Sequence, residues 1–265
     1  MPKADRPIQS VTVVGAGVAG LAAAQALADS GHNVRLIERR TYVGGRASSY
    51  EHPGTGEVID NCQHLLFGCC TNLIELCEQA GTADKIRWYD EQTFLEPNGN
   101  ASTIAVSGLP APLHFAPSFL TIPMLGVKDK LSIARGLMEF FRGHPGTDDE
   151  SVEQWLKRTR QTELSIKHFW RPIVMATLND DSTQCSTRYA GKVFHELFIK
   201  SSIGGRLGIP TVPLSEFYEA AAQLLVSLGG TVQLRASVEA ITQQPDGRSR
   251  VFSPPTTATQ VVTKR

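Results

Sequence analysis

The pattern of apolar and polar positions predicts a strand, a helix and a second strand near the N-terminus. Residues 11–14 form an apolar run, VTVV, which is typical of a buried strand. An Ala- and Leu-rich pattern at helical intervals follows to about Ser30, and a second apolar run ends at Glu38. This order of elements predicts a βαβ unit.

Further elements are expected immediately after this unit. A short strand is predicted over residues 57–60. Apolar residues at helical intervals then predict a helix over residues 65–79 that ends near Gly81.

Residues 97–127 contain no charged side chain and are interrupted by five prolines, at positions 97, 110, 112, 117 and 123. The prolines exclude a simple membrane-spanning helix. We expect this segment to line an apolar channel or to rest on a membrane surface. The alternative is a buried strand and loop.

Helices dominate the pattern in the middle of the chain. Residues 128–142 form an amphipathic helix, and a second helix is capped near Asp149 or Ser151. Two more are expected over residues 163–176 and 187–200. Core packing is predicted for the aromatic residues of these helices, with substrate contact as the alternative: Trp155, Phe169, Trp170, Phe194 and Phe198.

The pattern of strands returns near the C-terminus. Residues 214–228 predict a helix that ends at Gly229, and residues 231–235 and 238–242 read as strands. The last fifteen residues, 251–265, do not continue this pattern.

These elements predict an α/β fold with a largely helical insertion. The length of 265 residues suits one large or two modest domains. The predicted bounds are 1–95 for the first part of the α/β domain, 96–210 for the helical insertion, 211–252 for the second part of the α/β domain, and 253–265 for a divergent tail.

The charge composition of the chain argues against some classes of binding partner. With 26 basic and 26 acidic residues the chain is neutral, so no general attraction to nucleic acid or anionic lipid is expected. Residues 1–10 lack the features of an export signal, so a cytoplasmic location is expected.

Five cysteines are present, without a CxxC pair, and their odd number argues against a disulfide framework. Cys69, Cys70 and Cys77 fall at helical spacing and are predicted to act as small buried apolar residues. No metal site is expected.

A glycine motif between the first strand and its helix carries the strongest chemical signal. Gly15 permits a tight turn, Gly17 lets a pyrophosphate approach the backbone, and Gly20 lets the helix lie close to the strand. The helix start near Ala19 offers free N–H groups to phosphates, and Glu38 can accept hydrogen bonds from a ribose diol. The motif predicts an ADP-containing dinucleotide; the alternative is a glycine turn that only packs.

The residues that follow narrow the choice of nucleotide. Glu38 would repel a 2′-phosphate, which argues against NADP despite Arg39 and Arg40 beside it. Gly44, Gly45 and Arg46 form a second glycine turn, and the guanidinium offers a fixed fork to phosphate oxygens. The alternative for this turn is an ordinary surface turn.

Two segments resemble a known group of proteins. ERRTYVGGRASS, after the glycine motif, resembles the N-terminal signature of the FAD-dependent amine oxidase and phytoene desaturase superfamily. VIDNCQHLLFGCCTNLIELCEQAG is most similar to the hydroxysqualene dehydroxylase family, the squalene-associated flavoenzymes of bacterial hopanoid synthesis. The narrower resemblance depends chiefly on residues 60–68, and the whole extends to about residue 250.

The resemblance implies a Rossmann-like FAD-binding domain with an inserted helical substrate domain, and FAD as the cofactor. It places residues 61–64 near the isoalloxazine ring, although the superfamily pattern has glycine where this chain has Cys62. His64 is the one candidate catalytic residue, by position; the alternative is a structural histidine. The cofactor-binding residues assigned by the motif and the resemblance are Gly15, Gly17, Ala19, Gly20, Glu38, Arg39, Gly44, Gly45, Arg46, Gln63, His64 and Val238, the last through its backbone at the adenine.

Relatives carry a further flavin-contacting segment well beyond this length, so the chain is expected to be truncated at the C-terminus. The implied function is that of a flavoprotein oxidoreductase that removes the hydroxyl of hydroxysqualene to give squalene. Alternatives are a carotenoid desaturase or amine oxidase that uses oxidised FAD, and a truncated, non-catalytic nucleotide-binding fragment. The expected partners are a lipophilic isoprenoid and the inner face of the cell membrane as a peripheral contact, with no nucleic acid and no metal.

Overall fold

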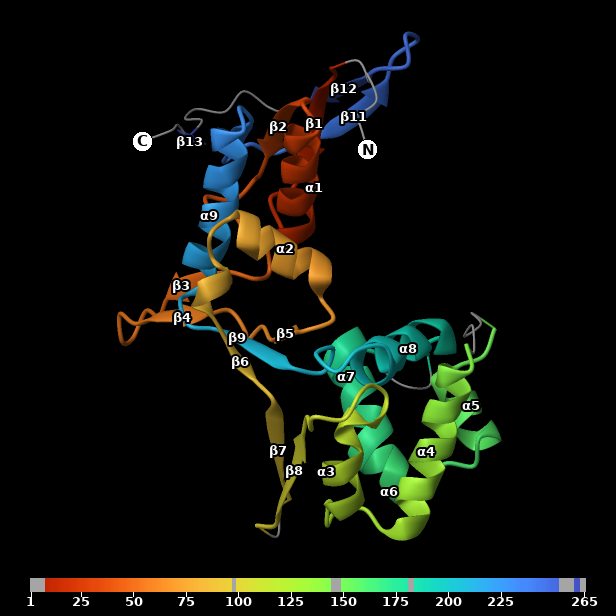
Figure 1. Ribbon diagram of the computed structural model, residues 1–265. Coiled ribbons are helices and arrows are strands. Elements are labelled where there is room, and N and C mark those ends of the chain that lie inside the picture. The colour runs from red at the N-terminus through yellow and green to blue at the C-terminus, as the bar shows by residue number, and fades with distance from the viewer. Residues whose placement is uncertain (1–7, 97–98, 144–148, 181–183, 253–259, 263–265) are drawn as a thin grey trace. The chain divides into compact units, whose positions relative to one another are not determined.

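The computed structural model describes residues 8–96, 99–143, 149–180, 184–252 and 260–262. The chain forms two compact units (Figure 1). The first contains Met1–Leu65, Thr71–Arg87 and Ile209–Arg265, and the second contains Leu66–Cys70 and Trp88–Gly208. The chain therefore leaves and re-enters the first unit twice.

The first unit is built on a four-stranded sheet in the order β1-β2-β10-β13. These strands are β1 (Ser10–Val14), β2 (Asn33–Ile37), β10 (Thr231–Leu234) and β13 (Gln260–Val262). The first three are parallel, and β13 pairs antiparallel with β10. Helix α1 (Val18–Asp29) connects β1 to β2, so the predicted βαβ unit is confirmed.

The helices of this unit bury apolar faces against one another and the sheet. Helix α1 buries Leu21, Ala24 and Ala28, and it packs against α9 (Leu214–Ser227), as does α2 (Thr71–Gln79) (Figure 1). The remaining elements of the unit are the hairpin of β3 (Ser49–Glu51) and β4 (Val58–Asp60), the hairpin of β11 (Ala240–Gln243) and β12 (Ser249–Phe252), and the short helix η1 (Ala83–Lys85).

The N-cap residue of helix α9 is Pro213, whose side chain makes no capping hydrogen bond. The hairpin of β3 and β4 supplies the cap instead. Asp60 Oδ1 accepts the N–H of Leu214 at 3.1 Å and the hydroxyl of Ser49 at 2.6 Å. Ser49 Oγ accepts the N–H of Ser215 at 3.0 Å. Two of the free N–H groups at the helix start are thus satisfied by one hairpin.

Asp60→Ala is therefore expected to lower the free energy of unfolding by about 1 kcal/mol, the usual value of a lost helix cap. Urea denaturation followed by circular dichroism measures this difference. Asp246→Ala is the matched control, because that carboxylate contacts only Arg248, through its N–H and its guanidinium, within an exposed hairpin turn. Equal losses in the two variants would contradict the capping role.

Four expectations from the sequence are wrong in detail, and the first two concern the segment before α2. The helix predicted over residues 65–79 begins only at Thr71, because Leu66 and Phe67 form β5 and pair antiparallel with Gly208 and Leu207 of β9 (Leu207–Pro210). Cys69 and Cys70 therefore lie in a turn and not on a helix, and both are only partly buried, whereas Cys77 is buried as predicted.

The strand predicted from Val238 begins at Ala240, and Val238 lies in the preceding coil. Residues 260–262 of the predicted tail form β13 and extend the sheet, although no strand was predicted there. The expectation of no export signal concerns residues 1–10, of which 1–7 lie outside the described residues; so do residues 253–259 and 263–265 of the tail.

The second unit is largely helical. Strand β6 (Ile86–Tyr89) leads into it, and β7 (Glu91–Leu95) and β8 (Ala101–Ala105) form a hairpin. The helices that follow are η2 (Leu113–Phe115), α3 (Ala116–Thr121), α4 (Val127–Phe141), α5 (Val152–Arg158), α6 (Glu163–Ser165), η3 (Ile166–Trp170), α7 (Arg171–Leu178), α8 (Thr187–Phe194) and η4 (His195–Ile199). Elements η3 and η4 are π-helical turns.

Aromatic side chains form the core of the second unit. Phe140 stacks on Trp155 with ring centroids 4.7 Å apart, and Trp170 lies edge-on to Phe194 at 4.6 Å. All four side chains are at most 2% exposed. Ser151 caps α5, since its Oγ accepts the N–H of Gln154. Core packing is confirmed for Trp155, Phe169, Trp170 and Phe194, whereas Phe198 is only partly buried against this core. The predicted cap near Ser151 is also confirmed.

Among the residues that the structure describes, no helix combines the length and the apolar character needed to cross a bilayer.

Candidate functional site

The register of the parallel sheet brings the glycine turn and the acid together. Val14 is opposite Ile37, so β1 and β2 end at the same level. Gly15 follows with a positive φ of 95°, which favours glycine, and its N–H donates to Ile37 O at 2.7 Å. An added Cβ at Gly20 would lie 1.9 Å from Gly15 O, so the turn and the helix touch through their backbones.

Glu38 lies directly behind this turn and is 8% exposed. Its Oε2 accepts the N–H of Ala16 at 2.8 Å, and its Oε1 accepts the N–H of Arg40 at 2.8 Å. Its backbone pairs with Gln233 and Ala236 as an extension of the sheet. The carboxylate is therefore held in one orientation, and each of its oxygens retains further acceptor capacity for a ligand hydroxyl.

The second glycine turn packs against the first. Gly44 N–H donates to Ala16 O at 2.8 Å, and an added Cβ at Gly45 would lie 3.1 Å from Gly17 Cα. Arg40 fixes this turn by donating from Nη1 to Gly45 O at 2.8 Å. The sequence did not assign Arg40 a role, because its partner is a backbone carbonyl that no motif records.

These residues fit a dinucleotide. An added Cβ at Gly17 would meet nothing within 4 Å, so the backbone at the start of α1, next to Ala19, is open to a phosphate. Arg39 and Arg46 are exposed, and their guanidinium groups have no hydrogen-bond or ion-pair partner within the described part of the chain. Two cations and a helix start supply the donors for a diphosphate, and Glu38 supplies the acceptor for a diol.

The other residues assigned from the sequence lie outside these turns. Gln63 and His64 are in the coil between β4 and β5. Asn61 Nδ2 donates to Arg46 O at 3.3 Å, which connects this segment to the second turn. His64 Nδ1 lies 2.8 Å from the carbonyl oxygen of Cys62, so its ring is held locally.

Val238 lies in coil, and its backbone N–H and C=O have no hydrogen-bond partner among the described residues. A free main-chain donor and acceptor are what recognition of a base edge requires. The adenine role assigned to Val238 stays a prediction, as do the roles of Gln63 and His64.

The second unit contains an apolar groove of about 430 Å³. Six of its thirteen lining residues come from the uncharged segment 97–127, and three come from the π-helical turns, which are frequent at functional sites in proteins. The lining residues are Ile104, Pro112, Leu113, Phe115, Ala116, Phe119, Ala134, Leu137, Met138, Phe141, Phe169, Phe198 and Ile199. None of these side chains is polar or ionisable.

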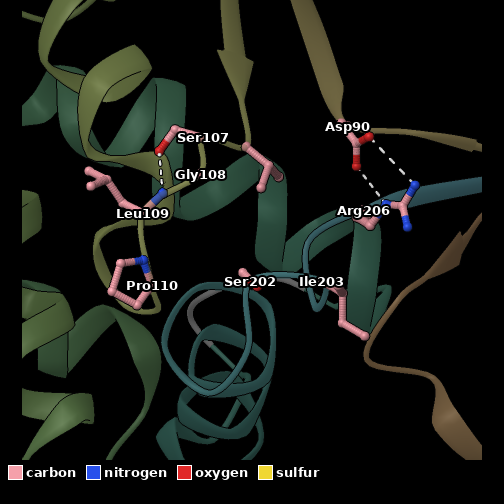
Figure 2. Close-up of a pocket in the computed structure, with 9 residues that line it drawn as sticks. Asp90, Ser107, Gly108, Leu109, Pro110, Ser202, Ile203 and Arg206 are labelled. Atoms are coloured by element: carbon pink, nitrogen blue, oxygen red, sulfur yellow. Dashed lines mark hydrogen bonds and ion pairs between the residues drawn. The ribbon is translucent and has the colours of Figure 1, made fainter.

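A second pocket of about 540 Å³, lined by both polar and apolar residues, lies in the same unit. Figure 2 shows Asp90 and Arg206 facing each other in an ion pair, with Nε to Oδ1 at 2.5 Å. Ser107 and Pro110 lie on one side of the pocket, and Ser202 and Ile203 belong to the loop that carries Arg206. Within the described residues, no group of three His, Cys, Asp or Glu side chains could hold a metal ion.

Parallel strands, a glycine turn at a helix start and a buried acid after the second strand define a dinucleotide-binding α/β protein. The chain matches the flavin containing amine oxidoreductase family over residues 18–262, and it belongs to that family. The protein is therefore a member of an oxidoreductase family, and its cofactor is FAD.

Curated relatives of the chain include carotenoid desaturases. The chain is 29% identical to zeta-carotene desaturase of Synechocystis sp. over 256 residues, which cover 91% of this chain and 52% of the relative. It is 27% identical to 15-cis-phytoene desaturase of Arabidopsis thaliana over 270 residues, which cover 95% of this chain and 46% of the relative. The chain thus spans about half the length of the curated relatives it matches.

Solved structures confirm the fold. An oxidoreductase from Methanosarcina mazei is 17% identical with a TM-score of 0.67, over 97% of this chain and 57% of that chain. Putrescine oxidase bound to putrescine is 21% identical with a TM-score of 0.65, over 94% of this chain and 56% of that chain. The Rossmann-like, FAD-binding fold predicted from the sequence is confirmed.

Proposed function

We propose that this chain forms part of an FAD-dependent oxidoreductase that desaturates a polyisoprenoid of the carotenoid kind. The observation that carries the proposal is the groove lined only by apolar side chains. Relatives named as zeta-carotene and phytoene desaturases support the same class of substrate. An amine substrate is disfavoured, because an ammonium group in this groove would have no hydrogen-bond acceptor among the lining side chains.

In this proposal, different residues of the chain bind the cofactor and the substrate. The two glycine turns, Arg46 and Glu38 hold the diphosphate and ribose, and Gln63, His64 and Val238 are proposed to contact the remaining parts of the cofactor. FAD supplies the capacity to accept a hydride from a C–H bond. The groove side chains Phe119, Phe169 and Phe198 orient an extended hydrocarbon and exclude water from it.

A second candidate is reductive dehydroxylation of hydroxysqualene, the reaction that the resemblance over residues 60–68 suggests. One observation favours it: His114 is 0% exposed, and neither ring nitrogen has a hydrogen-bond partner in the described structure. Its ring lies 4.3 Å from that of Phe115, a groove residue. Burial lowers the pKa of His114. A neutral imidazole has one donor and one acceptor, which suits a single substrate hydroxyl.

The experiment that separates these candidates is a product assay with the purified, FAD-loaded chain. Phytoene and zeta-carotene are incubated with oxidised FAD, and hydroxysqualene with chemically reduced FAD. A product with additional conjugated double bonds, detected by its red-shifted absorbance, supports desaturation. Squalene as the only product would support dehydroxylation instead. Bound flavin without any product would identify a non-catalytic nucleotide-binding chain.

Met138→Glu is expected to weaken binding of a polyene about tenfold, or about 1.4 kcal/mol, because a carboxylate in the groove has no partner. Met138 lines the groove and is 46% exposed, so the variant should fold. Quenching of intrinsic tryptophan fluorescence by a bound polyene measures the change. The matched control is Leu131→Glu on the same helix, which is 66% exposed and does not line the groove. Equal weakening in both variants would refute the groove as the binding site.

We also propose a cytoplasmic protein that contacts the inner face of the cell membrane through the rim of this groove. Leu113, Met138 and Phe141 line the groove and are 56%, 46% and 53% exposed. Such residues can insert into the interfacial layer and open a path for a lipid-soluble substrate. Flotation with phospholipid vesicles tests this, and a protein that stays at the bottom of the gradient would contradict it.

A further inference from the structure

The two cavities of the second unit are neighbours, and the proposed function uses only the apolar groove. Residues 106–110 line the pocket of Figure 2, which is called the mixed pocket from here on. Residues 112, 113, 115 and 116 line the groove. Along this segment only Ala111 separates the lining of one cavity from the lining of the other. A single elongated ligand can therefore occupy both.

Hydrogen bonds join the two linings directly. Leu113 of the groove donates its N–H to Pro110 O of the mixed pocket at 2.8 Å. Ser107 of the mixed pocket donates both its N–H and its hydroxyl to His114 O, each at 2.8 Å. Leu109 and Leu113 are 44% and 56% exposed. The ridge between the cavities, residues 109–113, is thus fixed in place, apolar and accessible to a ligand.

The groove alone is small for a long polyisoprenoid. Its volume is about 430 Å³, and that of the mixed pocket is about 540 Å³. Cavities of about 300–1,000 Å³ hold ligands of drug size, and a chain of many isoprene units is longer than such a ligand. The part of the chain that does not fit in the groove lies elsewhere, and the apolar ridge leads it to the mixed pocket.

Two polar groups of the mixed pocket are available to a ligand. Arg206 Nε lies 2.5 Å from Asp90 Oδ1 in the ion pair of Figure 2, but its N–H is not aligned for a hydrogen bond. This buried nitrogen has no hydrogen-bond partner within the described structure. The Ser202 hydroxyl also has none among the described residues. Trp88 helps to hold the guanidinium, whose Cζ lies 5.9 Å from the ring centroid.

The charges of the mixed pocket favour a neutral oxygen atom. Asp90 and Arg206 carry opposite charges, so a carboxylate or phosphate attracted by one would be repelled by the other. A hydroxyl or carbonyl oxygen can accept from the guanidinium without this repulsion. Leu109 and Ile203 supply apolar contacts beside it. This combination suits the end of an isoprenoid that carries one oxygen.

We propose that the mixed pocket binds the oxygen-bearing end of an isoprenoid alcohol or ketone, while its hydrocarbon chain crosses the ridge and lies in the groove. Arg206 and Ser202 are the residues that determine specificity for this oxygen. The inference rests on the proposed function, because it requires an isoprenoid in the groove. It adds a preference for an oxygenated isoprenoid over a hydrocarbon of the same shape, and it fixes the direction in which the chain lies.

Binding of two matched polyenes to the purified full chain tests the proposal. The probes are β-carotene and β-cryptoxanthin, which differ by one hydroxyl, in the same detergent micelles. Quenching of tryptophan fluorescence gives the two affinities, and their ratio is compared between variants. We expect the alcohol to bind about tenfold more tightly to the wild type, as for one hydrogen bond to a charged group. Arg206→Met should bring the ratio to about one, and Ser202→Ala should lower it about threefold.

Met138→Glu is the matched control, because Met138 lines only the groove. It should weaken both probes equally and leave their ratio unchanged. Ser202→Ala removes an unpaired hydroxyl, so its result decides the matter even if Arg206→Met folds poorly. Equal affinity of the wild type for the two probes, or an unchanged ratio in Ser202→Ala, would overturn this inference and leave the proposed function standing. Failure of both probes to bind the wild type would overturn the two together.

Discussion

Gly20→Ala is expected to destabilise the first unit by about 2 kcal/mol or more, although alanine is the better helix former. An added Cβ at this position would lie 1.9 Å from Gly15 O, a backbone atom that cannot move without opening the turn. Helix propensity alone favours alanine by about 1 kcal/mol, whereas overpacking of this kind costs about 3 kcal/mol. Urea denaturation followed by circular dichroism measures the net effect, and a stabilised variant would show that the turn is not closed as described.

Gly17→Ala is the matched control, since it changes the same motif in the same way. Its Cβ would meet no protein atom within 4 Å, so the variant should keep the stability of the wild type. It should nevertheless bind FAD more weakly, because the methyl group occupies the approach of the pyrophosphate. Flavin absorbance of the purified protein separates the two effects. Normal flavin content in Gly17→Ala and in the bulkier Gly17→Val would place the diphosphate elsewhere.

Glu38→Ala is expected to remove bound FAD and also to destabilise the protein without cofactor. The buried carboxylate accepts the N–H groups of Ala16 and Arg40, and each donor left unpaired costs about 1–3 kcal/mol. The ribose loses its acceptor at the same time. Titration of the variant with FAD, followed by flavin fluorescence, gives the affinity, and thermal unfolding gives the stability.

Glu38→Gln distinguishes the two roles of this side chain. The amide keeps one acceptor oxygen and replaces the other with a donor, so only one of the two backbone hydrogen bonds can be retained. An intermediate loss of stability and of affinity is expected. If Glu38→Ala bound FAD as tightly as the wild type, the nucleotide would not lie at this end of the sheet.

The sequence was most informative where chemistry depends on local spacing. The turn from Gly15 to Gly20 and the acid at Glu38 could be assigned because strand, turn and helix are neighbours along the chain. The parallel register of Val14 with Ile37, which brings Ala16 to Glu38, follows from the same short segment.

Contacts between segments that are distant in the sequence could not be predicted from the pattern of apolar and polar residues. Leu66 and Phe67 belong to a run of apolar residues at helical intervals, so a helix was predicted there. Their strand partner lies in Leu207–Pro210, far along the chain. The groove shows the same limit. Its uncharged segment was visible, whereas Met138 and the two π-helical turns join it only through packing. Arg40 donates a hydrogen bond to the backbone carbonyl of Gly45. Every residue has such a carbonyl, so the sequence does not indicate this contact.

The short stretch Leu66–Cys70 has a practical consequence for dissecting this protein. A recombinant piece that spans only Trp88–Gly208 would omit it, although it belongs to the helical unit. Leu207 and Gly208 would then lose their strand partners, and the carbonyls of Gly204 and Arg206 would lose their donors. Excision of the helical unit as one continuous segment should therefore yield an aggregation-prone polypeptide, and a circularly permuted gene that rejoins the missing stretch is the better route to isolating it.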